Sequence, residues 1–165
     1  MGLAATPELW FLPFALVIGA WVFYSDLATM KIPNKAVLAL GAVFLVIGLL
    51  ALPLTEYPWR LLHIVVVLVA GFAVNMAGMV GAGDAKFAAV MAPFVPLADA
   101  RLFLVLFAAV LLAAYLTHRL FRAAPAMRQR TADWESWTAG KKFPMGLALA
   151  GALAFYLALG VWFGA

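Results

Sequence analysis

Six long apolar segments follow one another along the chain, and they restrict its fold more than any other feature. They cover residues 9–25, 36–54, 61–80, 86–98, 102–118 and 143–163. Most approach the ~20 residues that a helix needs to cross a hydrocarbon core about 30 Å thick. Because helices satisfy their own backbone hydrogen bonds in lipid, the pattern predicts an all-α, polytopic transmembrane bundle of about six helices. We expect residues 1–165 to form a single membrane-embedded domain.

The composition excludes several other classes of protein and site. Apolar residues make up 68% of the chain and charged residues 11%, whereas about a quarter of the residues in soluble domains are charged. The absence of cysteine excludes disulfides, thiolate metal sites and a cysteine nucleophile. His63 and His118 stand far apart without an HExxH spacing, so we predict no metal and no cofactor. Loop topology explains the net charge of +4 better than nucleic-acid binding does.

The fourth apolar segment differs from the others because it is short and interrupted. It contains Pro93 and Pro96, and a proline in a helix interior removes a backbone donor and breaks the helix. Non-helical backbone is tolerated at membrane depth only where neighbouring protein buries it. The sequence therefore predicts a broken or partly re-entrant helix here, enclosed by the other helices.

Basic residues indicate how the bundle is oriented. They concentrate in the first, third and fifth connections, at Lys31, Lys35, Lys86, Arg119, Arg122, Arg128, Arg130, Lys141 and Lys142. Only Arg60 and Arg101 lie elsewhere. By the positive-inside rule these three connections face the cytoplasm, which places both termini on the non-cytoplasmic side. Asp26 and Asp84 then share the cytoplasmic side.

Asp26 ends the first apolar segment and precedes a turn. It lies in FYSDLATMKIPNKAV, where Pro33 and Asn34 indicate that the chain reverses before the next helix. An ionised side chain is costly in lipid, at least ~2.5 kcal/mol near the bilayer centre, and is therefore a functional candidate by default.

Asp84 lies at the junction of the third and fourth segments, in MVGAGDAKFAAV. Gly81 and Gly83 precede it, and glycine permits backbone torsions and close approaches that a side chain would block. We expect an extended substrate to lie against this segment. The four-residue GxGD pattern gains weight from a second aspartate at the same membrane depth.

Two carboxylates can hydrolyse a peptide if they are close enough to share a proton. One is then ionised and activates water, while the other is protonated and polarises the scissile carbonyl. Like charges a few ångströms apart disfavour double ionisation, so a buried pair holds one proton between its members. Asp26 and Asp84 are the candidates for such a dyad.

Three segments carry a resemblance to a known family. They are SDLATMKIPN at 25–34, GAGDAKF at 81–87 and FPMGLALAGAL at 143–153. The chain resembles the type IV prepilin leader peptidases, the A24 family of GxGD aspartyl proteases. In its small size it is similar to the CpaA/TadV-like branch associated with Flp and Tad pili. Met145 stands where the family has an aromatic residue.

The resemblance implies that Asp26 and Asp84 are the catalytic aspartates, with Gly81, Gly83, Lys86, Pro33 and Asn34 positioning substrate and backbone. Lys86 either orients the site or extends to the membrane surface. The implied substrate is a Flp-type or type IV prepilin, cut after its basic leader at the cytoplasmic face of the bacterial inner membrane. Larger relatives that also methylate the new N-terminus carry a cytoplasmic insert with a cysteine zinc site. Methylation is therefore not expected here.

Two other functions remain open from the sequence alone. A transporter or channel subunit would also place carboxylates in the membrane, but near its middle and usually within inverted repeats. A noncatalytic assembly factor of a pilus or secretion machine would keep the helices but tolerate Asp26→Asn. The position of both aspartates at the membrane edge favours the protease.

Overall fold

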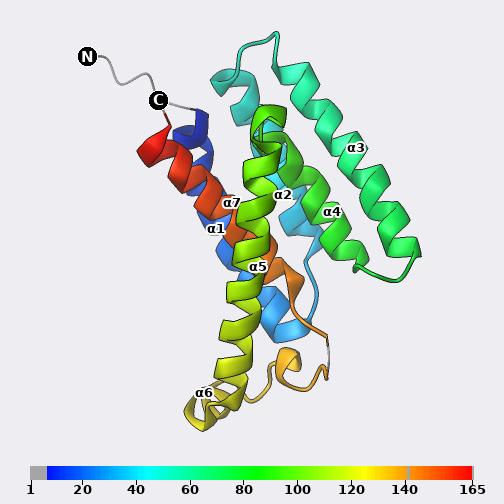
Figure 1. Cartoon of the computed structure of the whole chain (residues 1–165), viewed down its shortest axis with the longest axis vertical. Helices are drawn as coiled ribbons and strands as arrows, with labels where there is room; N and C mark the ends of the chain where they lie inside the picture. The colour runs from blue at the N-terminus through cyan, green and yellow to red at the C-terminus, as the bar shows by residue number, and fades with distance from the viewer. Residues whose placement is uncertain (1–6, 141, 165) are drawn as a thin grey trace.

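The computed structural model describes residues 7–140 and 142–164, and within this part of the chain it contains helices and connections but no strand. The elements are α1 (Pro7–Thr29), α2 (Asn34–Ala51), α3 (Tyr57–Met76), α4 (Ala82–Met91), α5 (Ala100–Ala123), α6 (Pro125–Arg130) and α7 (Met145–Phe163). Three short 3₁₀ helices join them: η1 (Ala92–Phe94), η2 (Leu97–Asp99) and η3 (Glu135–Trp137). Figure 1 shows α5 crossing in front of the packed pair α1 and α7, with α3 on the outer side of α4.

Five of these helices, α1, α2, α3, α5 and α7, are long and apolar enough to cross a membrane. Their outward surfaces are also apolar, as Val17 (73% exposed), Leu50 (74%) and Phe163 (80%) illustrate. Such surfaces suit lipid and would be unfavourable in water. The prediction of a polytopic helical membrane bundle is confirmed.

Prolines mark the points where helices begin. Pro33 and Pro144 immediately precede α2 and α7, and Pro58 and Pro125 occupy the first turn of α3 and α6. A proline there removes only an amide that has no partner within the helix, and its fixed φ suits the helical start. The turn residues of the sequence therefore set the helix boundaries.

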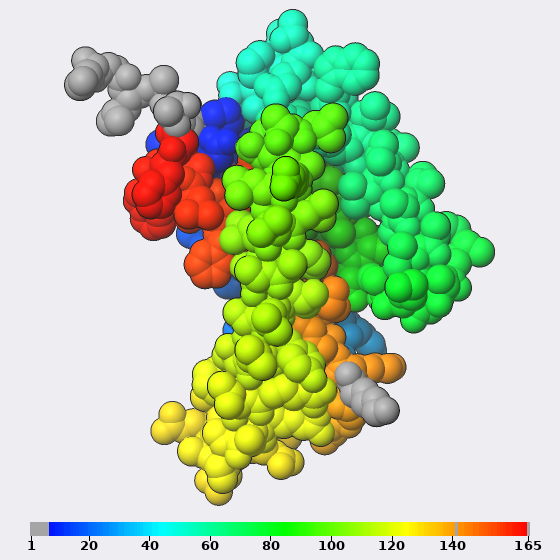
Figure 2. Space-filling view, in the orientation of Figure 1, coloured from blue at the N-terminus to red at the C-terminus, as the bar shows by residue number. Residues whose placement is uncertain are grey.

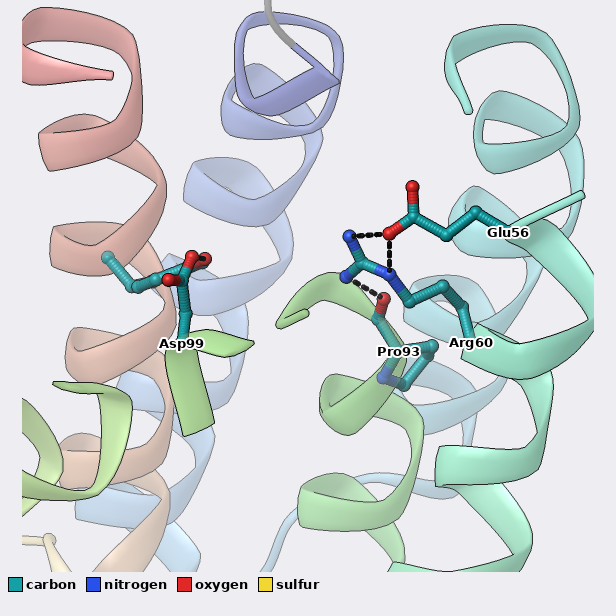
Figure 3. Close-up of polar contacts among 5 residues, drawn as sticks. Glu56, Arg60, Pro93 and Asp99 are labelled. Carbon is teal, nitrogen blue, oxygen red and sulfur yellow. Dashed lines mark hydrogen bonds and ion pairs between the residues drawn. The ribbon is translucent and has the colours of Figure 1, made fainter. Parts of the chain in front are cut away.

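The fourth apolar segment is broken, as its prolines predict. α4 has ten residues and ends at Met91, and η1 and η2 carry the chain across Pro93 and Pro96 to α5. The interruption frees the carbonyl of Pro93, which accepts a hydrogen bond of 3.1 Å from Nη1 of Arg60 on α3 (Figure 3). Arg60 thus compensates for the broken backbone inside the bundle.

The core lies between α1, α2, α4 and α7. Phe11, Phe44 and Phe94 form its aromatic part, with ring centroids 4.8–5.7 Å apart. Val22 and Leu153 are fully or almost fully buried in the same cluster. α1 packs most extensively against α7, and α3 against α4. The space-filling view shows α5 lying over this arrangement as a ridge (Figure 2).

In Figure 1, α1, α3 and α5 run downward and α2, α4 and α7 run upward, so the ends of the first three and the starts of the other three point toward the same end of the bundle. We call it the basic end because its helix ends and connections carry Lys31, Lys35, Lys86 and the arginines of residues 119–130. α1 begins and α7 ends at the opposite end. The basic connections of the sequence thus lie at one end of the bundle and the non-basic connections at the other. The cytoplasmic placement of the basic end stays a prediction.

Candidate active site

Asp26 lies on the last turns of α1, with its side chain turned into the protein. It is 4% exposed, although it is a charged residue type. Its Oδ2 accepts a hydrogen bond of 2.6 Å from the backbone N–H of Gly146, which is 120 residues away in the sequence. A buried carboxyl requires such a partner, because it has lost the hydrogen bonds of water.

The start of α7 supplies this partner. The first amides of a helix have no acceptor within the helix, so the N–H of Gly146, the second residue of α7, is available to the carboxylate. The aligned peptide dipoles also favour negative charge at this end of a helix. α7 follows Pro144, which is almost completely buried and holds the helix start in place.

Gly146 leaves no space for a side chain. A Cβ atom there would lie 2.9 Å from Oδ2 of Asp26, 3.0 Å from Cγ1 of Val22 and 3.1 Å from Cδ1 of Ile32. Close approach of the α7 backbone to Asp26 therefore requires glycine at this position.

Asp84 lies in the first turn of α4 and is half-buried. Its carboxylate faces the backbone amide of Gly81, and a Cβ atom on Gly81 would come within 2.6 Å of Oδ2. Gly81 has a φ of −67°, which any residue adopts. Gly81 therefore allows the carboxylate of Asp84 to approach the backbone closely. It does not adopt a torsion that only glycine permits.

Ile32 lies between the two aspartate-bearing segments. Its side chain is close to Gly146 beside Asp26, and its Cβ would be 3.5 Å from a Cβ on Gly83, next to Asp84. The turn after α1 therefore brings the end of α1, the start of α4 and the start of α7 together at the basic end.

Local hydrogen bonds fix this turn. Met30 ends α1 with a positive φ of 52°, and its amide still donates to the carbonyl of Asp26 at 3.0 Å. Oγ of Ser25 then donates to the carbonyl of Lys31 at 3.0 Å. These contacts reverse the chain direction within a few residues, and the side chain of Ile32 is buried in the core of the bundle.

Comparison with protein families decides the class. The model of the type IV leader peptidase family matches residues 10–117. The chain belongs to the type IV leader peptidase family. The matched region contains both Asp26 and Asp84 and ends before α7, which provides the amide of Gly146. Comparisons with curated proteins and with solved structures gave no significant match.

The resemblance to this peptidase family also predicts positioning residues around the aspartates. Lys86 on α4 extends to Asn34 at the start of α2, with 3.5 Å between Nζ and Oδ1, and both side chains are exposed. Pro33 precedes Asn34, and its carbonyl accepts the amides of the first turn of α2. Among the described residues, no ion pair joins Lys86 to either aspartate.

Sequence reasoning did not identify Gly146 or Ile32 as parts of this site. The FPMG segment at 143–146 resembles a motif of the leader peptidase family but does not indicate a partner for its glycine. In the structure the amide of Gly146 donates to Asp26. Ile32 carried no signal beyond its place between a lysine and a proline.

Other ionisable residues make polar contacts away from the aspartates. Arg60 is 7% exposed and pairs with Glu56 at 2.7 Å, and Asp99 accepts a hydrogen bond of 2.6 Å from the hydroxyl of Tyr156. Figure 3 shows Glu56, Arg60 and Asp99 near the end of the bundle opposite the basic end. Within residues 7–140 and 142–164, no group of three His, Asp or Glu side chains is arranged to hold a metal.

Proposed function

We propose that the chain is an intramembrane aspartyl endopeptidase that removes the leader of Flp-type or type IV prepilins, with Asp26 and Asp84 as its acid–base dyad. One observation carries the proposal. In a chain of the leader peptidase family, the turn after α1 meets the start of α4 at Ile32, so Asp26 and Asp84 lie at the same end of the bundle, each against a glycine backbone.

The chemistry follows from two carboxylates that share one proton. The ionised member takes a proton from water, and the protonated member donates a hydrogen bond to the scissile carbonyl. Water attacks the carbonyl carbon, and the tetrahedral intermediate collapses as the leaving amine is protonated. The amide of Gly146 holds Oδ2 of Asp26, and in this proposal Oδ1 is the atom that meets water.

The location of the dyad suits a substrate that is itself a membrane helix. A prepilin whose apolar helix lies in the bilayer presents the start of that helix at the membrane edge. The aspartates lie at the basic end of the bundle, which the positive-inside rule assigns to the cytoplasmic face of the bacterial inner membrane. The backbone at Gly81 and Ala82 is exposed next to Asp84, and we expect an extended substrate segment to approach the dyad from this side.

Processing of a co-expressed Flp-type prepilin, read as a mobility shift on a gel, tests this proposal. We expect Asp26→Asn and Asp84→Asn each to lower cleavage at least about a hundredfold, because acid–base groups contribute ~10²–10⁴-fold. Asp133→Asn is the matched control, since Asp133 is an exposed residue of the connection between α6 and η3. Undiminished cleavage by either dyad variant, with normal membrane insertion, would overturn the mechanism.

A further inference from the structure

A cavity lies at the basic end, apart from the aspartates. Its volume is about 430 Å³, and it is enclosed by the end of α5, by α6 and by the segment containing η3. Arg128, Gln129 and Thr138 supply polar groups, and the indole of Trp137 forms one wall. None of the lining residues belongs to the candidate active site.

The length of α5 argues that the cavity lies at the level of lipid headgroups. α5 has 24 residues, which at 1.5 Å per residue gives a length of ~36 Å, longer than a hydrocarbon core of ~30 Å. Its last turns and α6 extend beyond the other helices at the basic end (Figure 1). Trp134 stacks on Trp137 at 5.7 Å and meets Tyr24 edge-on at 6.1 Å. Such aromatic groups occupy the membrane–water interface.

The charge around the cavity favours an anion. Residues 119–142 contain six basic and two acidic residues. Two of the arginines have local partners: Arg122 donates to the carbonyl of Gly140 at 3.0 Å, and Arg119 lies over the ring of Tyr115 at 5.0 Å. Arg128 is exposed, and no carboxylate within the described residues lies within ion-pair distance of it. A guanidinium of this kind suits the oxygens of a phosphate, which it can bind in a bidentate manner.

Two buried polar side chains adjoin the Trp137 wall. His118 is almost completely buried, stacks on Trp137 at 5.0 Å, and has no hydrogen-bond partner at either ring nitrogen among the described residues. Ser136 is fully buried next to Trp137 in η3, and its hydroxyl is likewise without a partner there. Buried polar groups normally have partners, so this region has hydrogen-bonding capacity that the protein itself does not use.

We propose that this cavity binds the phosphate group of an anionic phospholipid. Arg128 would bind the phosphate, the amide of Gln129 would donate to a remaining oxygen, and Trp137 would pack against the glycerol and upper acyl carbons. Basic pockets beside membrane helices bind anionic headgroups in this manner. A free phosphate ion shares the chemistry, but the interfacial position of the cavity favours the lipid.

The test compares two arginines of α6 that lie two residues apart in the sequence. Full-length protein in phosphatidylcholine nanodiscs is titrated with phosphatidylglycerol, and separately with inorganic phosphate, while thermal stability is measured. Arg128→Gln removes the cavity guanidinium. Arg130→Gln is the matched control, because Arg130 is also exposed on α6 but does not line the cavity.

We expect phosphatidylglycerol to raise the melting temperature of the wild type. Arg128→Gln should weaken the apparent affinity at least about tenfold, as expected for a lost charge-assisted hydrogen bond, and Arg130→Gln less than about fivefold. Protection by phosphatidylglycerol alone assigns a lipid site, and protection by inorganic phosphate as well assigns a site that recognises the phosphate itself. Equal losses in the two variants, or no preference for phosphatidylglycerol over phosphatidylcholine, would overturn the proposal.

Discussion

Replacing Gly146 by alanine tests the contact that links α7 to Asp26. The new methyl carbon would lie 2.9 Å from Oδ2 of Asp26 and about as close to Val22 and Ile32. All three neighbours are buried, so the carboxylate has to move and the 2.6 Å hydrogen bond from the Gly146 amide is lost or lengthened. A hydrogen bond to a charged group contributes ~1.5–3 kcal/mol, and ~2 kcal/mol corresponds to about thirtyfold.

We therefore expect Gly146→Ala to reduce prepilin cleavage about thirtyfold or more in a single-turnover assay with purified enzyme in detergent. The fold should persist, because alanine favours a helix over glycine by ~1 kcal/mol. Gly151→Ala is the matched control on the same helix, since its methyl would meet only Cγ1 of Val110, at 3.2 Å. Cleavage by Gly146→Ala within about threefold of wild type, at unchanged stability, would refute the assignment of the Gly146 amide to Asp26.

Three further substitutions separate the site from its scaffold. Gly81→Ala places a methyl 2.6 Å from Oδ2 of Asp84, so the same assay should show at least about a tenfold loss of cleavage without loss of membrane insertion. Arg60→Ala leaves the carbonyl of Pro93 without its donor and should lower thermal stability in detergent by an amount equivalent to ~1–3 kcal/mol. Lys86→Gln breaks only a long, exposed contact, so cleavage should change less than about threefold, and a larger loss would assign Lys86 a direct part in the reaction.

Much of this arrangement follows from local sequence patterns. Apolar segments near twenty residues predict the long helices because lipid demands that length. Pro93 and Pro96 predict the break after α4 because proline cannot continue a helix interior. Asp26 and Asp84 stand out as candidates because an acid is costly in an apolar environment. Each of these inferences needs only residues that are neighbours in the chain.

The contacts that complete the site are not local, and the sequence does not reveal them. Nothing near Asp26 indicates that its partner is an amide 120 residues further on. Arg60 shows the same limit, since it stands just before the apolar segment 61–80 and nothing beside it in the sequence indicates its partner at Pro93. Arg60 is buried, because the break at Pro93 leaves a carbonyl that needs a donor. Such pairings depend on how helices dock, which hydrophobic pattern alone does not specify.

The docking of α7 therefore determines the geometry of Asp26. The family match contains both aspartates but ends at residue 117, before the start of α7. α1 packs more extensively against α7 than against any other helix, so the position of the Gly146 amide is fixed by the same interface that buries Val22 and Leu153. A shift of α7 along α1 would leave both aspartates in place but move the amide of Gly146 away from Asp26. Sequence variation at this interface is thus expected to change activity through Asp26, even though the substituted residues touch no substrate.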